Sequence, residues 1–551
     1  MFLNKNLLSD QDEAWQLPSK FHSCWNARGS YNPLEFVLRL RPDIHQALDT
    51  INPGIRSAGE LEYSQIEAFS TYFHETIHWW QHVGSTIGLT LSFLYPAQSH
   101  VNYRHLKWFN QHVGQIKSIR KYNLAHAKPK SQETESDRKT NIILNNWHDI
   151  EFFRWLVIDP KRANEYLNDP YFECVGHSYK ITIGSILWLL SSTIDPNFTI
   201  FPDPRNWEPE FQALKNKKQE GYFHGSQVRL SPIGAREIFE GQARFSQLQY
   251  LYSASGGNFS WDAFRSIGML NGVYREAFDV FLKIAGVNWP DTPLAPAVGL
   301  FLLVCDIAIN PTDGFPFDID NLSFFVPSVD PGIRFLMLCN AIVEIKPSLL
   351  NAITKYSKEE YLEISELLCR KLAYRTPNTI AKNVTHWTKT HEGCKAILNE
   401  DASFDFKLEN LPVRVFFARF LRFQIDKFSS PEFFCWPGIW SAGDRNGLCS
   451  LERAEELFDE HRALFLDRED GDVYLRTFPD KNEQTALKTF NTFYSWNATY
   501  ELTRQWIVED GPFDLYFFWL TSKYSRQEME EWAAKCFEQS YGIEISSFQI
   551  L

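Results

Sequence analysis

A long amphipathic helix near the amino end constrains this chain more than any other feature, because a helix with an apolar stripe must bury that stripe against other elements. Ser64 and Glu67 have the S-x-x-E spacing of a capping box, which predicts a helix start. Beyond this point apolar side chains recur mostly at steps of three or four residues, at Ile66, Phe69, Phe73, Ile77, Trp80, Ile87 and Leu91. The pattern predicts a core helix that begins at Ser64.

The same helix carries the string His74-Glu75-Thr76-Ile77-His78. Histidines four residues apart project from one face of a helix, so both imidazoles can reach one metal ion. Glu75 then stands beside the position left for water, where its carboxylate can accept a proton. The spacing predicts a zinc site with His74 and His78 as ligands and Glu75 as the catalytic base. The alternative is three solvated polar residues on a helix surface.

A catalytic zinc takes a third protein ligand as well as water. His82 continues the series of histidines, but ligands at steps of four and eight on a straight helix cannot converge, since the first and last are about 12 Å apart along the axis. A longer known spacing, H-E-x-x-H-x-x-G-x-x-H, needs histidine where this chain has Gly84. We therefore expect His82 to pack in the core or to support a ligand.

A carboxylate on a second predicted helix, which begins near Ser231-Pro232, is a better third ligand. Glu240 is favoured because it precedes Gly241, and glycine in a helix interior costs about 1 kcal/mol relative to alanine. A close approach of two helices beside a metal would explain that glycine. Glu237 is the alternative ligand, and without a metal both carboxylates would pair with neighbouring arginines.

With the His-Glu-His helix and the segment Glu240-Gly241-Gln242-Ala243-Arg244, the chain resembles the gluzincins, zinc peptidases whose third ligand is a glutamate on a second helix. The resemblance implies Zn²⁺ as cofactor, His74, His78 and Glu240 as metal ligands, and Glu75 as base. Arg244 departs from the family, because many gluzincins have aspartate there. The G-x-M-E-N signature of exopeptidases is also absent. The resemblance therefore favours an endopeptidase that acts on a protein or peptide substrate.

Two other functions fit the same residues. The ion and base would also serve a zinc hydrolase of a non-peptide amide or ester. A regulatory or binding protein could retain a zinc site, although structural zinc normally has four protein ligands and does not need Glu75. The donor that stabilises charge on the substrate is left open. Its candidates are His177, His224, Arg244, Tyr250 and Tyr252.

The composition is that of a folded chain, since 44% of the 551 residues are hydrophobic and 15% are aromatic. The formal net charge of -13 provides no basic footprint for nucleic acid or an anionic membrane. The apolar stretches Ile181–Ile194 and Leu294–Ile309 are too short to span a bilayer and are expected to be buried helices. We therefore expect neither nucleic acid nor membrane as a partner, and the oligomeric state is left open.

The cysteines and the first residues bear on the compartment. Nine cysteines are scattered singly with no C-x-x-C pair, which suits neither a disulfide scaffold nor a cysteine-based zinc site. Met1–Lys20 carries several charges and has no apolar core of signal-peptide length. We expect a cytoplasmic location.

Strand and helix periodicities together predict an α+β fold that is predominantly α-helical. The alternation over Phe36–Arg41 is typical of a strand, whereas later windows such as Leu451–Phe465 are helical. A cluster of prolines just after residue 289 marks a boundary. We predict a zincin-like catalytic domain over residues 1–290 with a small N-terminal sheet, and a helical domain of unknown role over 291–551. The polar residues 127–141 are expected to form an exposed loop or a disordered insert.

Overall fold

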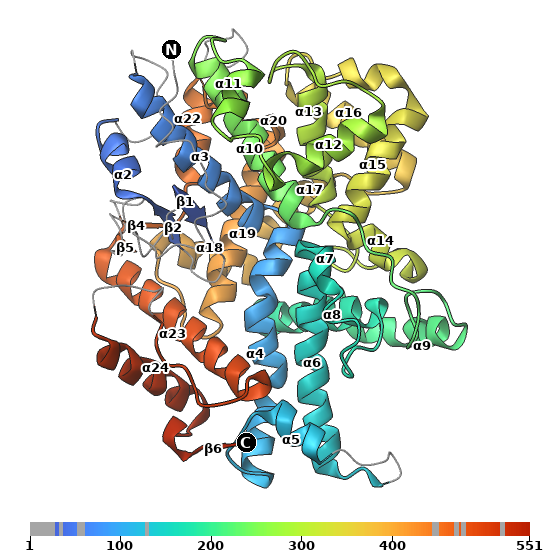
Figure 1. Cartoon of the computed structure of the whole chain (residues 1–551), viewed down its shortest axis with the longest axis vertical. Coiled ribbons are helices and arrows are strands. Elements are labelled where there is room, and N and C mark those ends of the chain that lie inside the picture. Colours follow the sequence, from blue (N-terminus) through green and yellow to red (C-terminus); the bar gives the residue numbers. More distant parts are fainter. Residues whose placement is uncertain are drawn as a thin grey trace.

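The computed structural model describes residues 28–31, 37–51, 61–126, 132–442, 451–467, 473–474, 481–517 and 524–551. Over this part the chain is predominantly helical with a small sheet, as the sequence predicted (Figure 1). Met1–Lys20 and residues 127–131 of the expected insert lie outside the described residues.

The longer helices carry most of the core. They are α3 (Tyr63–Gly84), α4 (Thr86–His112), α6 (Glu135–Ile158), α8 (Val175–Thr193), α10 (Ala235–Ala254), α12 (Val273–Ala285), α13 (Pro296–Ala308), α15 (Pro331–Ile345), α16 (Lys358–Leu372), α17 (Pro377–Thr390), α18 (Glu392–Ser403), α19 (Leu411–Ser429), α22 (Leu451–Glu460), α23 (Glu483–Val508) and α24 (Arg526–Tyr541). Proline opens several of them, such as α13 and α17, because the first turn of a helix does not need its N–H donors.

Shorter helices connect these elements. They are α2 (Pro42–Asp49), α5 (Ile119–Ala125), α7 (Pro160–Ala163), α9 (Glu208–Asn216), α11 (Trp261–Ser266), α14 (Phe325–Val329), α20 (Pro431–Cys435) and α21 (Pro437–Trp440). In Figure 1, α23 and α24 lie at the lower left, whereas α12, α13, α15 and α16 lie at the upper right.

The main sheet joins the two ends of the chain. Its strand order is β1-β2-β4-β5, with β1 (Gly29–Tyr31) antiparallel to β2 (Val37–Leu40). Strand β2 runs parallel to β4 (Phe465–Asp467), which pairs antiparallel with β5 (Val473–Tyr474). The small sheet was predicted from N-terminal residues alone, but half of its strands come from the C-terminal part. A second sheet pairs β3 (Ile116–Lys117) with β6 (Gln549–Ile550).

The buried carboxylate of Asp467 strengthens this long-range pairing. Its Oδ1 accepts a hydrogen bond from the Leu40 N–H at 3.0 Å and lies 2.7 Å from Nε2 of His45. The helix predicted over Leu451–Phe465 is therefore wrong at its end, because α22 stops at Glu460 and Phe465 begins β4. Long-range pairing with β2 overrides the local helical pattern.

Helix α3 begins close to the predicted start, but with a different cap, and the prediction of one continuous helix through Leu91 is wrong because α3 ends at Gly84 and Ser85 caps the start of α4. Glu62 is the N-cap residue, and its backbone N–H donates to Oε1 of Gln65 at 2.9 Å while its side chain caps the first turn. Ser64 and Glu67, the predicted capping pair, lie inside the helix. The reciprocal bonds that define a capping box are made two residues earlier than the S-x-x-E spacing suggested.

Helix α3 is buried on all sides over residues 66–81, so its polar residues lie in the core and not on a solvated face. It packs along α10, against α4 and against α19. Gln424 of α19 donates from Nε2 to the Gly84 carbonyl at 2.7 Å, and Nε1 of Trp80 donates to the His461 carbonyl at 2.6 Å. Segments on both sides of residue 290 thus hold this helix. The division into 1–290 and 291–551 stays a prediction.

The prediction that residues 127–141 form an exposed loop or a disordered insert is wrong over the second half of this segment. Residues 135–141 form the first turns of α6, which Thr134 and Asp137 open with a capping box. Trp147 and Phe153 further along the helix are buried, and this packing stabilises the polar turns that precede them.

The two apolar stretches are buried over most of their length, as expected, although Trp188 in the first is exposed. Helix α8 covers most of the first stretch and α13 most of the second, and Leu187 and Leu302 on them are fully buried. Within the described ranges no single helix has the length and apolar character to cross a membrane, while one sharply bent pair, Leu322–Val329 with Pro331–Ile345, passes on those two criteria.

Candidate metal centre

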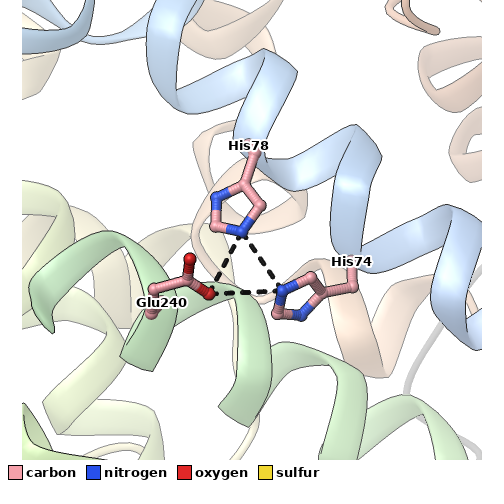
Figure 2. A group of neighbouring side chains, drawn as sticks. All are labelled: His74, His78 and Glu240. Atoms are coloured by element: carbon pink, nitrogen blue, oxygen red, sulfur yellow. Dashed lines mark hydrogen bonds and ion pairs between the residues drawn. The ribbon is translucent and has the colours of Figure 1, made fainter. Parts of the chain in front are cut away.

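Three predicted ligands meet between two helices. His74 and His78 project from successive turns of α3, and Glu240 reaches them from α10 (Figure 2). Nε2 of His74 lies 3.1 Å from Nε2 of His78. Oε2 of Glu240 lies 3.5 Å from the first nitrogen and 3.3 Å from the second. Among the described residues, His74, His78 and Glu240 form a group of side chains that lie close enough together to hold one metal ion.

The size of this triangle fits tetrahedral zinc. Zinc binds histidine nitrogen at about 2.0 to 2.1 Å and carboxylate oxygen at a similar distance, so tetrahedral ligand atoms are about 3.3 to 3.4 Å apart. The three edges, 3.1, 3.3 and 3.5 Å, centre on that value. Two imidazoles and a carboxylate are also the donor set of open, catalytic zinc sites. The residues therefore fit Zn²⁺ with one coordination position to spare.

Burial and charge set the protonation of the triad. Burial lowers the pKa of His74 to about 4, despite the nearby Glu240 carboxylate. Burial acts on His78 in the same direction, but the charge and hydrogen bonding of Glu240 outweigh it and raise that pKa to about 9. Burial would raise the pKa of Glu240, yet the charge of His78 and the hydrogen bonds from both histidines hold it well below its usual range. Near neutral pH and without metal, His74 is therefore neutral, Glu240 is ionised and His78 is a cationic imidazolium, which must lose one proton before it can bind a metal.

Zinc affinity should depend on pH through this single proton. Because His78 is protonated below about pH 9, zinc must displace its proton, and the apparent affinity should fall about tenfold for each pH unit below that value. His74 and Glu240 add no further dependence near neutrality. Chelator competition across this range measures the slope. Release of two protons per zinc, or a flat profile, would contradict the assignment.

Gln81, which the sequence did not single out, supports His78 from behind. Nδ1 of His78 donates to Oε1 of Gln81 at 2.8 Å. The same amide donates from Nε2 to the Phe239 carbonyl at 2.9 Å and to Oε1 of Gln242 at 3.0 Å. Spacing of three residues on a helix could have suggested the contact with His78. Its partners on α10 could not be found from sequence.

Glu75 is buried next to the triad, and its charge contributes to the raised pKa of His78. Strand β1 passes directly over it. A Cβ atom added to Gly29 would lie 2.6 Å from Cγ of Glu75, closer than real side chains approach. A glycine on this strand therefore makes room for the predicted base.

The alternative ligand, Glu237, has another role. Its Oε2 accepts the backbone N–H of Gly234 at 2.7 Å, and its Oε1 lies 3.1 Å from a guanidinium nitrogen of Arg236. It caps the first turn of α10, one turn before Glu240. The prediction that Gly241 allows a close approach of two helices beside the metal is wrong. A Cβ atom there would approach Phe301 at 3.3 Å and Ala277 at 3.5 Å. The glycine thus lies against α13 and α12, not against α3.

His82 is a packing residue, as the helix geometry predicted. Its Nδ1 donates to the His78 carbonyl at 2.9 Å, and its ring lies 5.4 Å from those of both Tyr31 and Phe239. Burial lowers the pKa of His82 to about 4, so the ring is neutral.

Of the five candidate donors, Arg244 is the one whose charge acts on the triad, since it helps to lower the pKa of His74. Its guanidinium lies 3.9 Å from the ring centroid of Tyr274, whose ring is 6.1 Å from that of His74. Tyr274, on α12, is a residue that the sequence did not single out.

The other four candidates have different neighbours. His177 lies 3.0 Å from Oδ2 of Asp149, and His224 is an exposed residue near Glu173. Tyr250 packs among core aromatic rings, and Tyr252 covers the turn at Gly257.

In comparisons with known proteins, no family model, no curated protein and no solved structure matched this chain.

Proposed function

We propose that this chain is a zinc-dependent hydrolase that cleaves amide bonds in a protein or peptide substrate. The observation that supports this most is the spacing of His74, His78 and Glu240, whose ligand atoms lie within 4.8 Å of one another. Edges near 3.3 Å suit one tetrahedral ion and leave a position for water. Glu75 beside this group is what a hydrolytic site needs and a closed structural site does not.

The roles of the residues follow from their chemistry. Zinc, when bound, makes water more acidic and polarises a carbonyl. Glu75 accepts a proton from the attacking water and passes it to the leaving nitrogen. Arg244 and Tyr274, on the His74 side of the triad, supply positive charge and a hydroxyl donor for the substrate oxygen.

The wider assignment rests on the same residues. We propose a zincin-like domain of the gluzincin type within residues 1–290, in which α3 and α10 carry the ligands. Arg244 in place of the usual aspartate is a departure, and the Gln81 amide takes over the support of a histidine ligand. The seven cysteines in the described part of the chain are free and buried, which favours a reducing compartment, and we propose the cytoplasm.

Metal content and hydrolysis, measured on the intact protein, test the proposal. We expect one zinc per chain and cleavage of denatured casein-like protein or of a peptide library, lost on chelation and restored by Zn²⁺. Turnover of small esters or amides only would favour the non-peptide hydrolase. Stoichiometric zinc with no hydrolysis would favour the binding protein. Absence of zinc would overturn the assignment.

Gly29→Ala should impair catalysis and leave zinc in place. The added methyl group would overlap Cγ of Glu75 at 2.6 Å, so the base must move. Misplacement by about 1 Å can cost on the order of 100-fold in rate. We expect kcat to fall by about 10-fold to 100-fold with unchanged zinc content.

Gly184→Ala is the matched control for that substitution. Its new Cβ would meet Cβ of Pro204 at an ordinary 3.5 Å, so activity should be unchanged. Equal activity of Gly29→Ala and wild type would mean that Glu75 has room to spare or is not the base.

A further inference from the structure

The hydrogen bonds behind His78 have a fixed polarity. Neutral imidazole has one N–H donor and one lone-pair acceptor, and only the lone pair can bind a metal. A glutamine amide also has two unlike ends, and which end faces a neighbour depends on its other partners. The direction of the whole chain of bonds therefore depends on a group that cannot be reversed.

That group is the backbone carbonyl of Phe239. A carbonyl can only accept, so the Gln81 atom 2.9 Å from it must be the amide nitrogen. The second bond from this nitrogen, to Oε1 of Gln242 at 3.0 Å, has the same direction. Oε1 of Gln81 is then the atom that faces His78 at 2.8 Å, and it requires a proton on Nδ1.

We infer that Gln81 and Gln242 are positioning residues that hold His78 as the Nδ1–H tautomer, with the Nε2 lone pair aimed at the metal position. The inference rests on the proposed zinc site and extends it. Phe239 immediately precedes Glu240 in α10, so the backbone that presents the carboxylate ligand also sets the orientation of a histidine ligand on α3. The two ligand-bearing helices are thereby coupled at a residue separation of 161.

His74 differs from His78 in this respect. Its Nδ1 is buried and has no hydrogen-bond partner among the described residues. The support is therefore specific to His78, and its loss should weaken zinc binding without removing a ligand. Such supporting bonds are typically worth about 10-fold to 100-fold in metal affinity.

Zinc affinity of three variants tests the inference. Gln81→Met keeps the bulk of the side chain and removes all three bonds, so affinity should fall by about 10-fold to 100-fold. Gln242→Leu removes one acceptor while the Phe239 carbonyl still holds Gln81, so the loss should be about 3-fold to 10-fold, the effect of one neutral hydrogen bond. Gln242→Glu keeps an oxygen acceptor for Nε2 of Gln81, so this variant should bind zinc at least as tightly as wild type.

Gln424→Met is the matched control. Gln424 is equally buried and also donates to α3, at the Gly84 carbonyl, but it does not contact a ligand. It should lower Tm to a similar extent as Gln81→Met and leave zinc affinity unchanged. Wild-type affinity in Gln81→Met, or an equal loss in Gln424→Met, would overturn the inference while the zinc site itself stands.

A second measurement needs no metal. Long-range ¹H–¹⁵N correlation of ¹⁵N-histidine-labelled, metal-free protein, at a pH where His78 is neutral, reports which ring nitrogen carries the proton. We expect Nδ1–H in wild type and a substantial Nε2–H population in Gln81→Met. An Nε2–H tautomer in wild type would overturn the inference. If the protein bound no zinc but His78 were Nδ1–H, the proposed function would fail and the positioning role would stand.

Discussion

Glu75→Gln is expected to retain zinc, whereas its rate of hydrolysis should fall by about 100-fold to 10,000-fold, the usual contribution of a general base. The amide has the size of the carboxylate but cannot accept a proton from water. Zinc should stay bound because the proposed ligands are His74, His78 and Glu240, and Glu75 is not in that group. Metal analysis and kcat measured on the same preparation check both parts.

The same variant should also change how zinc binding depends on pH. The negative charge of Glu75 contributes to the raised pKa of His78, so its removal should lower that pKa and ease proton displacement by zinc near neutral pH. Near-normal turnover in Glu75→Gln would mean that another group is the base. Loss of zinc together with activity would mean that Glu75 has a structural role at the site.

Glu240→Gln is expected to lose zinc, whereas Glu237→Gln should keep it. Apparent binding free energies of structural zinc in zinc-finger peptides are on the order of 10 to 16 kcal/mol. On that scale, an equal share for one of three ligands is at least about 3 kcal/mol, or more than about 100-fold in affinity. A neutral amide replaces the one charged ligand in Glu240→Gln. Zinc titration with a competing chelator measures the difference.

Glu237→Gln is a suitable control because it makes the same chemical change one turn earlier on α10. The amide oxygen can still accept the Gly234 N–H that Glu237 accepts at 2.7 Å, so the helix cap should persist. If Glu237→Gln lost zinc and Glu240→Gln kept it, the third ligand would be assigned wrongly. If both kept zinc, the site would not use a carboxylate from α10.

Local periodicity made part of this site predictable. Residues four apart on a helix share a face whatever surrounds the helix, so His74 and His78 could be paired before any tertiary contact was known. The rejection of His82 as a ligand had the same basis, since rise per residue is a property of the helix itself. The buried helices α8 and α13 also follow from composition over a short window.

Contacts between distant segments were less accessible. The sequence favours Glu240 over Glu237 because of Gly241, but this glycine packs against Phe301 and Ala277 and not beside α3. The choice depends on how α10 is rotated about its own axis, and that rotation is set by all the helices around it. The cap at Glu62 and the start of α6 at Glu135 show that element boundaries also depend on their surroundings.

The sequence by itself determined that one helix presents two imidazoles and a carboxylate in the order His-Glu-His, because helical spacing is a local property. Only the tertiary structure decided that Glu240 completes the triangle, that Phe239 and Gln242 on α10 orient the Gln81 amide, and that Gly29 makes room for Glu75. It also decided that β2 pairs with β4. Each of these contacts joins segments far apart in the chain, and their free energy comes from burial shared by the whole core, which no short window of sequence contains.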